Sequence, residues 1–168
     1  IALDSGETFY GHTRGKVELR AAISDYVHSI YNIDIEDERI TVPGSSMSAI
    51  TLACQMTLSK SDHALIVSPH WPNIDRAIQV TGAEYSCVRQ LQTQNGWQLV
   101  IEDVRKSVRK NTKAIYINSP SNPTGWVMSR EQQHELLEFI KGREEQKFVL
   151  VTITDTEGST YRKKGFKK

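Results

Sequence analysis

Apolar residues recur along the chain in two alternating patterns. Leu19, Ile23 and Ile30 fall at helical spacing, whereas residues 64–67 form a continuous apolar run, which is typical of a strand buried on both faces. Strands that alternate with helices favour a covered parallel sheet, so we predict an α/β fold: a three-layer α/β/α sandwich with a mostly parallel sheet. The patterns predict helices over 19–30, 46–58, 73–80, 101–110 and 129–141, and strands over 39–42, 64–67, 84–88, 113–118 and 147–154. Ser129 is the predicted N-cap of the last helix, with Gln132 rather than Glu three residues after it.

The composition is that of a globular domain rather than a disordered chain. There are 168 residues, 38% of them hydrophobic, and the formal net charge of +1 gives no reason to expect a nucleic-acid partner. The longest apolar run, residues 148–151, is far shorter than the roughly 18 residues of a membrane span. Cys54 and Cys87 are too few for a disulfide scaffold and lack metal-ligand spacing, which favours a reducing, cytoplasmic compartment. The chain opens with Ile1 rather than Met, and we interpret it as a piece of a longer protein.

Ligands of a parallel sheet bind where strands lead into helices, so chemistry is expected in the turns after the strands. The first such turn, residues 43–49, joins a strand to a helix through Gly44, Ser45 and Ser46. Free N–H groups at a helix N-terminus, with serine hydroxyls beside them, form a phosphate site. An ordinary N-cap explains the same residues, and the turn by itself favours that simpler interpretation.

Two further turns combine prolines with side chains suited to a planar ligand. In residues 68–73, two prolines flank Trp71, whose indole can stack on a ring, although a lone Trp more often plugs the edge of a core. His70 beside it is a weak candidate for a base, and we expect its replacement to do little. In residues 118–126, Asn122 lies between two prolines in a stiff turn, where its amide can donate a hydrogen bond to a ligand oxygen.

The Asn-Pro-Thr-Gly string of residues 122–125, after an apolar strand, resembles the signature of the class I/II aminotransferases, pyridoxal-phosphate enzymes of fold type I. The resemblance extends in the expected order over residues 6–140. It implies an incomplete large domain of that fold, pyridoxal 5′-phosphate as cofactor, and an amino acid and a 2-oxo acid as substrates. The segments that carry it are Tyr10, 13–15, 18–20, 39–44, 68–72, 77–83 and 122–125.

The resemblance also implies a role for each matching residue. Ser45 and Ser46 would hold the cofactor phosphate. Trp71 would stack on the pyridine ring, and Asn122 would donate to the phenolic oxygen of that ring. Tyr10 matches a position that reaches the phosphate of the neighbouring subunit, which implies a homodimer. We expect Ser46, Trp71 and Asn122 to gather on one side of the molecule.

The pattern departs from the family after residue 140. The family continues with a strand that ends in Asp-Glu-x-Tyr, whose Asp pairs with the pyridine nitrogen; here Asp155 is the nearby candidate, without the Glu-x-Tyr. The lysine that forms the Schiff base is expected further downstream, beyond the last residue, because Lys163 and Lys164 follow Asp155 too closely. We therefore expect this chain alone to be inactive.

The tail has a resemblance of its own. Residues 148–165 resemble the N-terminal strand and loop of the accessory proteins that mature the molybdenum cofactor of xanthine dehydrogenase. We therefore divide the chain into an aminotransferase large-domain segment, residues 1–140, and a divergent tail, residues 141–168, which arose by fusion or by a shift of the reading frame.

Two alternative functions stay open. One is a fold type I lyase or decarboxylase. The other is a non-catalytic phosphate-binding α/β module; the first turn argues against it, because the turn contains neither Gly-x-Gly-x-x-Gly nor Gly-Lys-Ser/Thr.

Overall fold

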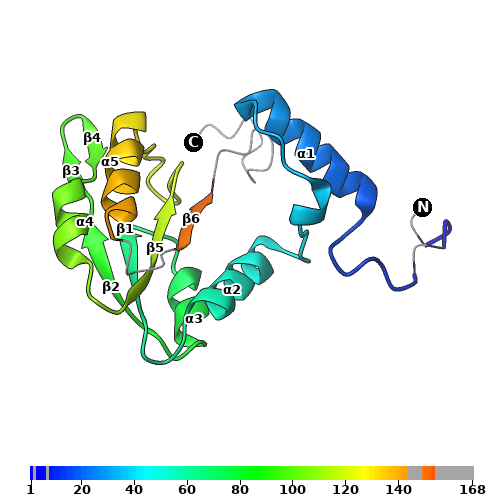
Figure 1. Cartoon of the computed structure of the whole chain (residues 1–168), viewed down its shortest axis with the longest axis horizontal. Coiled ribbons are helices and arrows are strands. Elements are labelled where there is room, and N and C mark those ends of the chain that lie inside the picture. The colour runs from blue at the N-terminus through cyan, green and yellow to red at the C-terminus, as the bar shows by residue number, and fades with distance from the viewer. Residues whose placement is uncertain (2, 7, 144–148, 154–168) are drawn as a thin grey trace, which may run out of the picture. The chain divides into compact units, whose positions relative to one another are not determined.

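The chain separates into two compact units, Ile1–Leu52 and Ala53–Lys168 (Figure 1). The structure is a computed structural model that describes residues 1, 3–6, 8–143 and 149–153. The boundary falls within helix α2 (Ser46–Thr57), so the C-terminal part of this helix belongs to the second unit. Within the described part of the chain, no helix is both long enough and apolar enough to cross a membrane.

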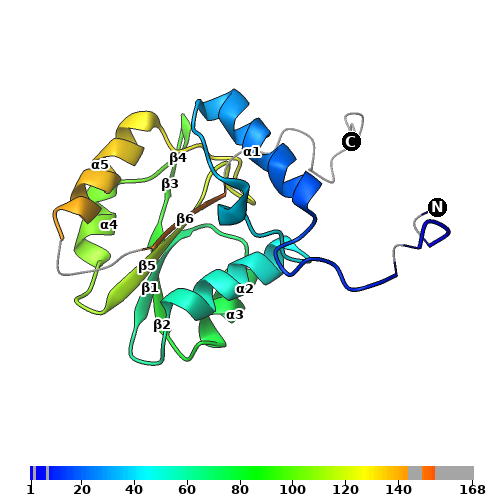
Figure 2. The ribbon, with the colours of Figure 1, turned by 45° about the vertical axis from the view of Figure 1, so that its right-hand side comes forward.

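The second unit is built on a parallel sheet. Its strands follow the spatial order β2-β1-β5-β6, and every neighbouring pair is parallel. Figure 1 and Figure 2 show α3 on one face of this sheet and α4 and α5 on the other, which confirms the predicted α/β fold. The elements are β1 (His63–Ser68), α3 (Asn73–Gln79), β2 (Glu84–Arg89), α4 (Ile101–Ser107), β5 (Thr112–Asn118), α5 (Arg130–Lys141) and β6 (Val149–Ile153).

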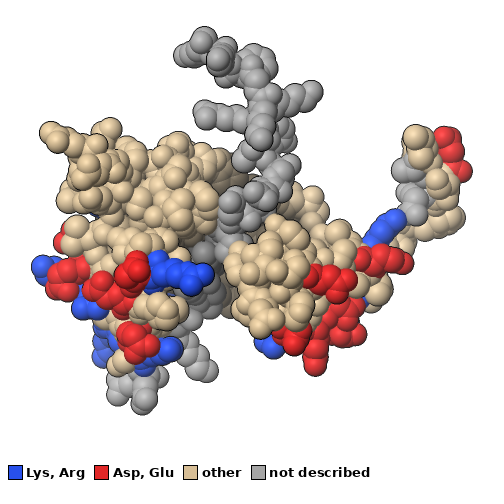
Figure 3. Space-filling model, turned by 90° about the horizontal axis from the view of Figure 1, so that it is seen from above, with Lys and Arg blue, Asp and Glu red and all other residues tan. Residues whose placement is uncertain are grey.

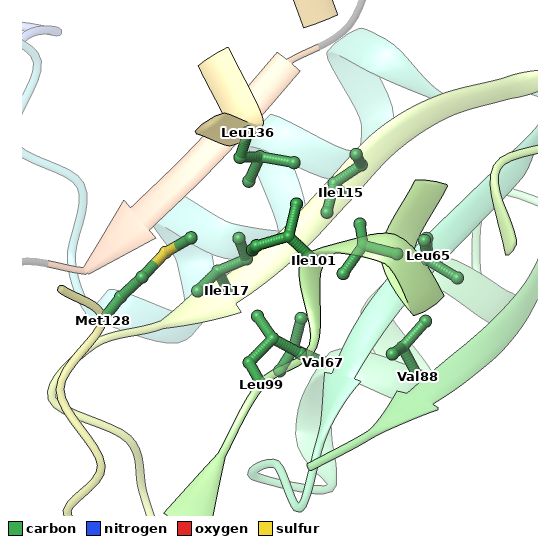
Figure 4. Packing of buried hydrophobic residues seen from close by; sticks show 10 residues of the cluster. Leu65, Val67, Val88, Leu99, Ile101, Ile115, Ile117, Met128 and Leu136 are labelled. Atoms are coloured by element: carbon green, nitrogen blue, oxygen red, sulfur yellow. The ribbon is translucent and has the colours of Figure 1, made fainter. Parts of the chain in front are cut away.

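The central strand β1 is buried on both faces. Leu65 and Val67 belong to the cluster that packs against Ile101 of α4 and Leu136 of α5 (Figure 4). Ile66, between them in sequence, is equally buried and points to the opposite face, because successive side chains of a strand alternate. The apolar run therefore forms a strand that both helical layers cover, and this core holds the strand ends in place.

A capping box starts α5 where the sequence predicts its N-cap. The Ser129 hydroxyl accepts the Gln132 N–H at 3.2 Å, and the Gln132 side-chain oxygen accepts the Ser129 N–H at 3.2 Å. The amide nitrogen of Gln132 also donates to the Leu99 carbonyl at 2.8 Å, which ties the start of α5 to the segment before α4.

The first unit contains α1 (Val17–Tyr31), the short 3-10 helix η1 (Asp37–Arg39) and the N-terminal part of α2. A buried arginine joins the first two of these helices. The Arg20 guanidinium donates to the Asp37 carbonyl at 2.7 Å and lies 3.6 Å from the Asp37 carboxylate. With a side chain only 4% exposed, Arg20 makes a charge-assisted contact that holds η1 against α1.

The predicted strand over 39–42 is wrong. Arg39 ends η1, and the extended backbone at Ile40 (φ −101°, ψ 129°) belongs to no sheet among the described residues. The Val42 N–H donates to the Arg14 carbonyl at 3.0 Å, but this single hydrogen bond does not make a ladder of paired strands. The β-branched run therefore indicates the extended backbone correctly, but a strand also needs a partner, and the pattern says nothing about that.

Two more differences concern the segment between β2 and β5. A small antiparallel hairpin, formed by β3 (Leu91–Thr93) and β4 (Gly96–Gln98), was not predicted, although its Asn-Gly pair is a common hairpin signal. The helix predicted over 101–110 ends at Ser107, because the next residue, Val108, has an extended backbone (φ −72°, ψ 124°).

Candidate functional site

The candidate site in the second unit lies where the order of the strands reverses. The chain passes from β1 through α3 to β2 on one side, and then returns through α4 to β5 on the other side of β1. In α/β proteins, ligands bind at such a reversal, beyond the carboxyl ends of the two strands. Trp71 follows β1 and Asn122 follows β5, so both predicted cofactor contacts flank this point.

The loop that carries Trp71 is anchored to the start of α3. The indole is half-buried, and the Trp71 carbonyl accepts the Ile74 N–H at 3.4 Å. One residue earlier, the His70 Nε2 lies 2.7 Å from the Asp75 carboxylate, and both side chains are largely buried. His70 therefore has a specific partner on α3, and this contact was not predicted from the sequence.

The Asn122 side chain is exposed and forms no hydrogen bond with the described residues, whereas its backbone is fixed by Asn118. The Asn118 side-chain oxygen accepts the Asn122 N–H at 3.0 Å, and its amide nitrogen donates to the Pro120 carbonyl at 2.9 Å. The arrangement leaves the Asn122 amide, with two N–H donors, available to a ligand. The role of Asn118 was not predicted, although asparagine side chains commonly form hydrogen bonds with the backbone a few residues further along the chain.

The rest of this loop closes on itself. Ser121 donates its N–H to the Trp126 carbonyl at 2.8 Å and accepts the Gly125 N–H at 2.7 Å through its own carbonyl. Gly125 has a φ of +71°, a conformation that favours glycine. The Ser119 hydroxyl accepts the Met128 N–H at 2.9 Å. These contacts make the loop after β5 a preorganised support rather than a free connection.

Ser45 and Ser46 lie at the N-terminus of α2, in the first unit. The Ser45 hydroxyl accepts the Ser48 N–H at 3.1 Å and lies 3.0 Å from the Ser48 hydroxyl, so Ser45 is the N-cap of the helix. Ser46, the first helical residue, is exposed. The simpler interpretation of this turn therefore holds, and it is compatible with an anion, because a capped helix still presents N–H groups in its first turn.

Two candidate residues have no contacts that assign them a role. Tyr10 is fully exposed in the first unit. Asp155 lies outside the described residues, as do Lys163 and Lys164; the described chain ends at Ile153, the last residue of β6, which pairs with Asn118 of β5. Trp71 and Asn122 belong to the second unit and Ser46 to the first, so the expected gathering of these three residues stays a prediction.

Neither of the two cysteine thiols in the described part of the chain is an activated nucleophile. Burial, and then the negative charge of Asp75, raises the pKa of the Cys87 thiol, and burial also raises the pKa of Cys54. Both thiols are therefore protonated at neutral pH, and thiolate chemistry is disfavoured. Among the described residues, no group of three or more His, Cys, Asp or Glu side chains is placed to hold a metal ion.

Charges of both signs lie side by side on the outer surface of α4 and α5. Arg105 pairs with Glu135 at 3.1 Å, Lys106 with Glu102 at 3.8 Å, and Lys141 with Glu138 at 3.1 Å. In Figure 3 the Lys and Arg side chains on this part of the second unit alternate with Asp and Glu. Such a mixed surface has no single-sign field to attract a polyanion.

Comparison with known proteins places this geometry in a family. Residues 1–151 match the family model described as aminotransferase class I and II. The chain belongs to the class I and II aminotransferase family. Members of this family use pyridoxal 5′-phosphate. Each unit, taken by itself, has residues that fit part of that group. In the second unit, the Trp71 indole suits a planar ring and the exposed Asn122 amide suits a ring oxygen; in the first unit, the α2 N-terminus suits a phosphate.

Relatives and solved structures of aminotransferases resemble this chain over most of its length. A probable aspartate/prephenate aminotransferase of Aquifex aeolicus is 34% identical over 138 residues, which are 82% of this chain and 35% of that protein. A probable aspartate aminotransferase of Methanocaldococcus jannaschii is 29% identical over 165 residues, 98% of this chain and 42% of that protein. The structure of an alanine aminotransferase from Pyrococcus furiosus matches this chain with a TM-score of 0.81 and 28% sequence identity. The match covers 90% of this chain and 37% of the Pyrococcus furiosus chain. The aminotransferase-family chain thus spans about two fifths of the length of the proteins it matches.

Proposed function

We propose that this chain is the cofactor-binding part of an aminotransferase large domain and binds pyridoxal 5′-phosphate through non-covalent contacts. The protein to which it corresponds transfers an amino group between an amino acid and a 2-oxo acid. The observation that carries the proposal is that Trp71 and Asn122 follow adjacent parallel strands at the reversal of strand order. When bound, the cofactor supplies an electron sink, and the protein binds and orients it.

Each residue has a separate task in this proposal. The Trp71 indole covers one face of the pyridine ring and excludes water from it. The Asn122 amide donates to the phenolic oxygen, and Asn118 holds the Asn122 backbone in place for that contact. Ser45 and Ser46 receive the phosphate with the first N–H groups of α2, where the helix dipole favours an anion.

The test is a titration of the 168-residue chain with 4′-deoxypyridoxine 5′-phosphate. This analogue lacks the aldehyde, so it cannot react with surface lysines and reports only non-covalent contacts. Binding is read from quenching of tryptophan fluorescence and checked by equilibrium dialysis. Deoxypyridoxine without its phosphate is the matched ligand, and we expect it to bind more weakly because it cannot use the α2 N-terminus.

Two substitutions test the assignment of the ring contacts. Trp71→Ala removes the stacking and Asn122→Ala removes one hydrogen bond, and each should cost about 1 kcal/mol, or roughly fivefold in Kd. Trp97→Ala is the control, since Trp97 lies in the β3–β4 hairpin. Equal affinity for the analogue and its phosphate-free form, or a larger loss in Trp97→Ala than in Trp71→Ala, would contradict the proposal.

Asp155 is proposed as the partner of the pyridine nitrogen. In its support, β6 lies beside β5 and ends two residues before Asp155. A carboxylate at that nitrogen favours its protonated form. Asp155→Ala should therefore weaken analogue binding, whereas Asp155→Glu should retain part of it; an unchanged Kd in both variants would remove Asp155 from the site.

A homodimer is also proposed, with Tyr10 reaching the phosphate bound by the partner copy. Its support is the full exposure of Tyr10 and the 91% exposure of Phe9, since contiguous exposed aromatic groups favour association. Light scattering at increasing concentration should give self-association for the wild type and less for Phe9→Ser. A monomer at every concentration would refute this part.

The remaining proposals concern the cellular compartment of the protein and its C-terminal tail, residues 141–168. Among the described residues, Cys54 and Cys87 are both free thiols, which supports a reducing, cytoplasmic compartment. We retain the division into segment 1–140 and a divergent tail 141–168 that resembles molybdenum-cofactor accessory proteins. Deleting residues 154–168, which keeps β6 and the rest of the sheet, should leave analogue binding in place apart from the contribution of Asp155; complete loss would contradict the division.

A further inference from the structure

The pair formed by His70 and Asp75 has no role in the proposed function so far. The His70 Nε2 lies 2.7 Å from the Asp75 carboxylate, and the two side chains are 12% and 24% exposed. Such a short, largely buried contact between an imidazole and a carboxylate is stronger than an ordinary surface hydrogen bond. It spans the turn between β1 and α3, because His70 precedes Trp71 and Asp75 lies in the first turn of α3.

The pair restrains the backbone from which the Trp71 indole projects. His70 and Trp71 are consecutive, so a fixed His70 side chain limits the dihedral angles of the residue that carries the indole. On the other side of Trp71, Pro72 has a restricted φ, and its carbonyl accepts the Asp75 N–H at 3.2 Å. Together with the hydrogen bond from the Ile74 N–H to the Trp71 carbonyl, the segment from His70 to Asp75 is thus closed by one side-chain contact and two backbone contacts.

The other ring nitrogen of His70 is consistent with an orienting role. His70 Nδ1 is buried and has no hydrogen-bond partner in the described part of the chain. The residue two positions on is Pro72, which has no N–H to donate to it. The carboxylate oxygen can only accept, so the imidazole donates from Nε2, and this contact fixes the orientation of the ring.

Asp75 also connects this turn to the edge strand β2. Burial, and then the negative charge of Asp75, raises the pKa of Tyr85, which lies on β2. The Asp75 carboxylate therefore interacts with Tyr85 of β2 as well as with His70.

We infer that His70 and Asp75 form a positioning pair that holds the Trp71 indole ready to stack on the cofactor ring. The inference rests on the proposed function, in which Trp71 covers that ring. It revises the expectation that replacing His70 does little. Because the pair acts through Trp71, its loss cannot cost more than removal of the indole, so His70→Ala should raise the Kd of 4′-deoxypyridoxine 5′-phosphate about two- to fivefold.

Two conservative variants separate positioning from general stability. The side-chain nitrogen of Gln reaches about as far as imidazole Nε2, whereas that of Asn reaches only about as far as Nδ1. His70→Gln can therefore keep the contact to Asp75, and His70→Asn cannot. The experiment uses the full 168-residue chain with Trp97 and Trp126 replaced by Phe, so that Trp71 alone emits.

Two quantities are measured for each variant: acrylamide quenching of ligand-free Trp71 and the Kd of the analogue. We expect His70→Asn and Asp75→Asn to increase quenching and raise the Kd, and His70→Gln to restore both. In a Trp71→Ala background, read by equilibrium dialysis, His70→Asn should have no further effect on the Kd.

Two results would overturn the inference. One is that His70→Gln and His70→Asn change the quenching and the Kd equally; the other is that His70→Asn raises the Kd as much in the Trp71→Ala background as in the parent chain. If the parent chain does not bind the analogue, the proposed function fails, and the ligand-free quenching still decides whether the pair positions Trp71. Circular dichroism identifies a variant that does not fold, and Asp75→Asn then replaces His70→Asn in the comparison.

Discussion

His63 makes the stability of the second unit dependent on pH. Its side chain is fully buried at the start of β1, with Nδ1 2.8 Å from the Thr112 hydroxyl of β5 and Nε2 2.9 Å from the Ser86 hydroxyl of β2. One imidazole therefore joins three adjacent strands. Replacing it with Gln disturbs two hydrogen bonds between neutral groups, which should cost roughly 1–3 kcal/mol at about pH 7.5.

The pH dependence follows from the charged form of the same ring. Burial, and then the positive charge of Arg109, lowers the pKa of His63 from its ordinary value of 6.5, while Glu84 acts in the opposite direction. Below that ordinary value, the unfolded chain binds the proton more readily than the folded chain. The stabilisation is therefore complete above about pH 6.5 and decreases as the pH falls, by at most about 1.4 kcal/mol per pH unit.

Urea unfolding followed by tryptophan fluorescence measures both effects. The difference in the free energy of unfolding between the wild type and His63→Gln should be largest at about pH 7.5 and smaller at about pH 5.5. His134→Gln, an exposed substitution on α5, is the matched control and should show no such change. A difference that stays constant, or grows on acidification, would refute the buried neutral imidazole.

Two further substitutions test the packing of each unit. Leu136→Ala should lower the free energy of unfolding by about 2–5 kcal/mol, because the Leu136 side chain is only 1% exposed in the core. Leu137, which is 39% exposed, provides the control: Leu137→Ala should lower the free energy of unfolding far less, and urea unfolding measures both variants. Gly15→Ala should destabilise the first unit by about 1–2 kcal/mol, because φ is +91° and the new Cβ would lie 2.8 Å from Val42 Cβ. Gly11→Ala, where no atom lies within 4 Å, is the control, and hydrogen exchange of the α1 amides should distinguish the two.

The sequence predicts the second unit well because its elements are defined by local patterns. The run at 64–67 could only be a buried strand or part of a buried helix, and its short length favours the strand. The helix over 129–141 is confirmed with its N-cap, since Ser129 and Gln132 have the spacing of a capping box. Periodicity and capping act within a few residues, so a single sequence reveals them.

Features that depend on distant residues could not be predicted in this way. Residues 39–42 have the composition of a strand, but whether they join a sheet depends on a partner elsewhere. Similarly, nothing in the sequence pairs His70 with Asp75, because the contact depends on how the turn after β1 meets α3. Trp71 and Asn122 could be recognised from their motifs, whereas the support that Asn118 gives to Asn122 required the loop geometry.

The central claim is that a pyridoxal phosphate ring lies between the loops after β1 and β5. Nuclear Overhauser effects between the ring methyl protons of 4′-deoxypyridoxine 5′-phosphate and the assigned side chains of the 168-residue chain test it most directly. We predict contacts to the Trp71 indole and to the Asn122 side-chain amide in one complex. Contacts only to residues outside these two loops, with Trp71 and Asn122 unaffected, would contradict the account.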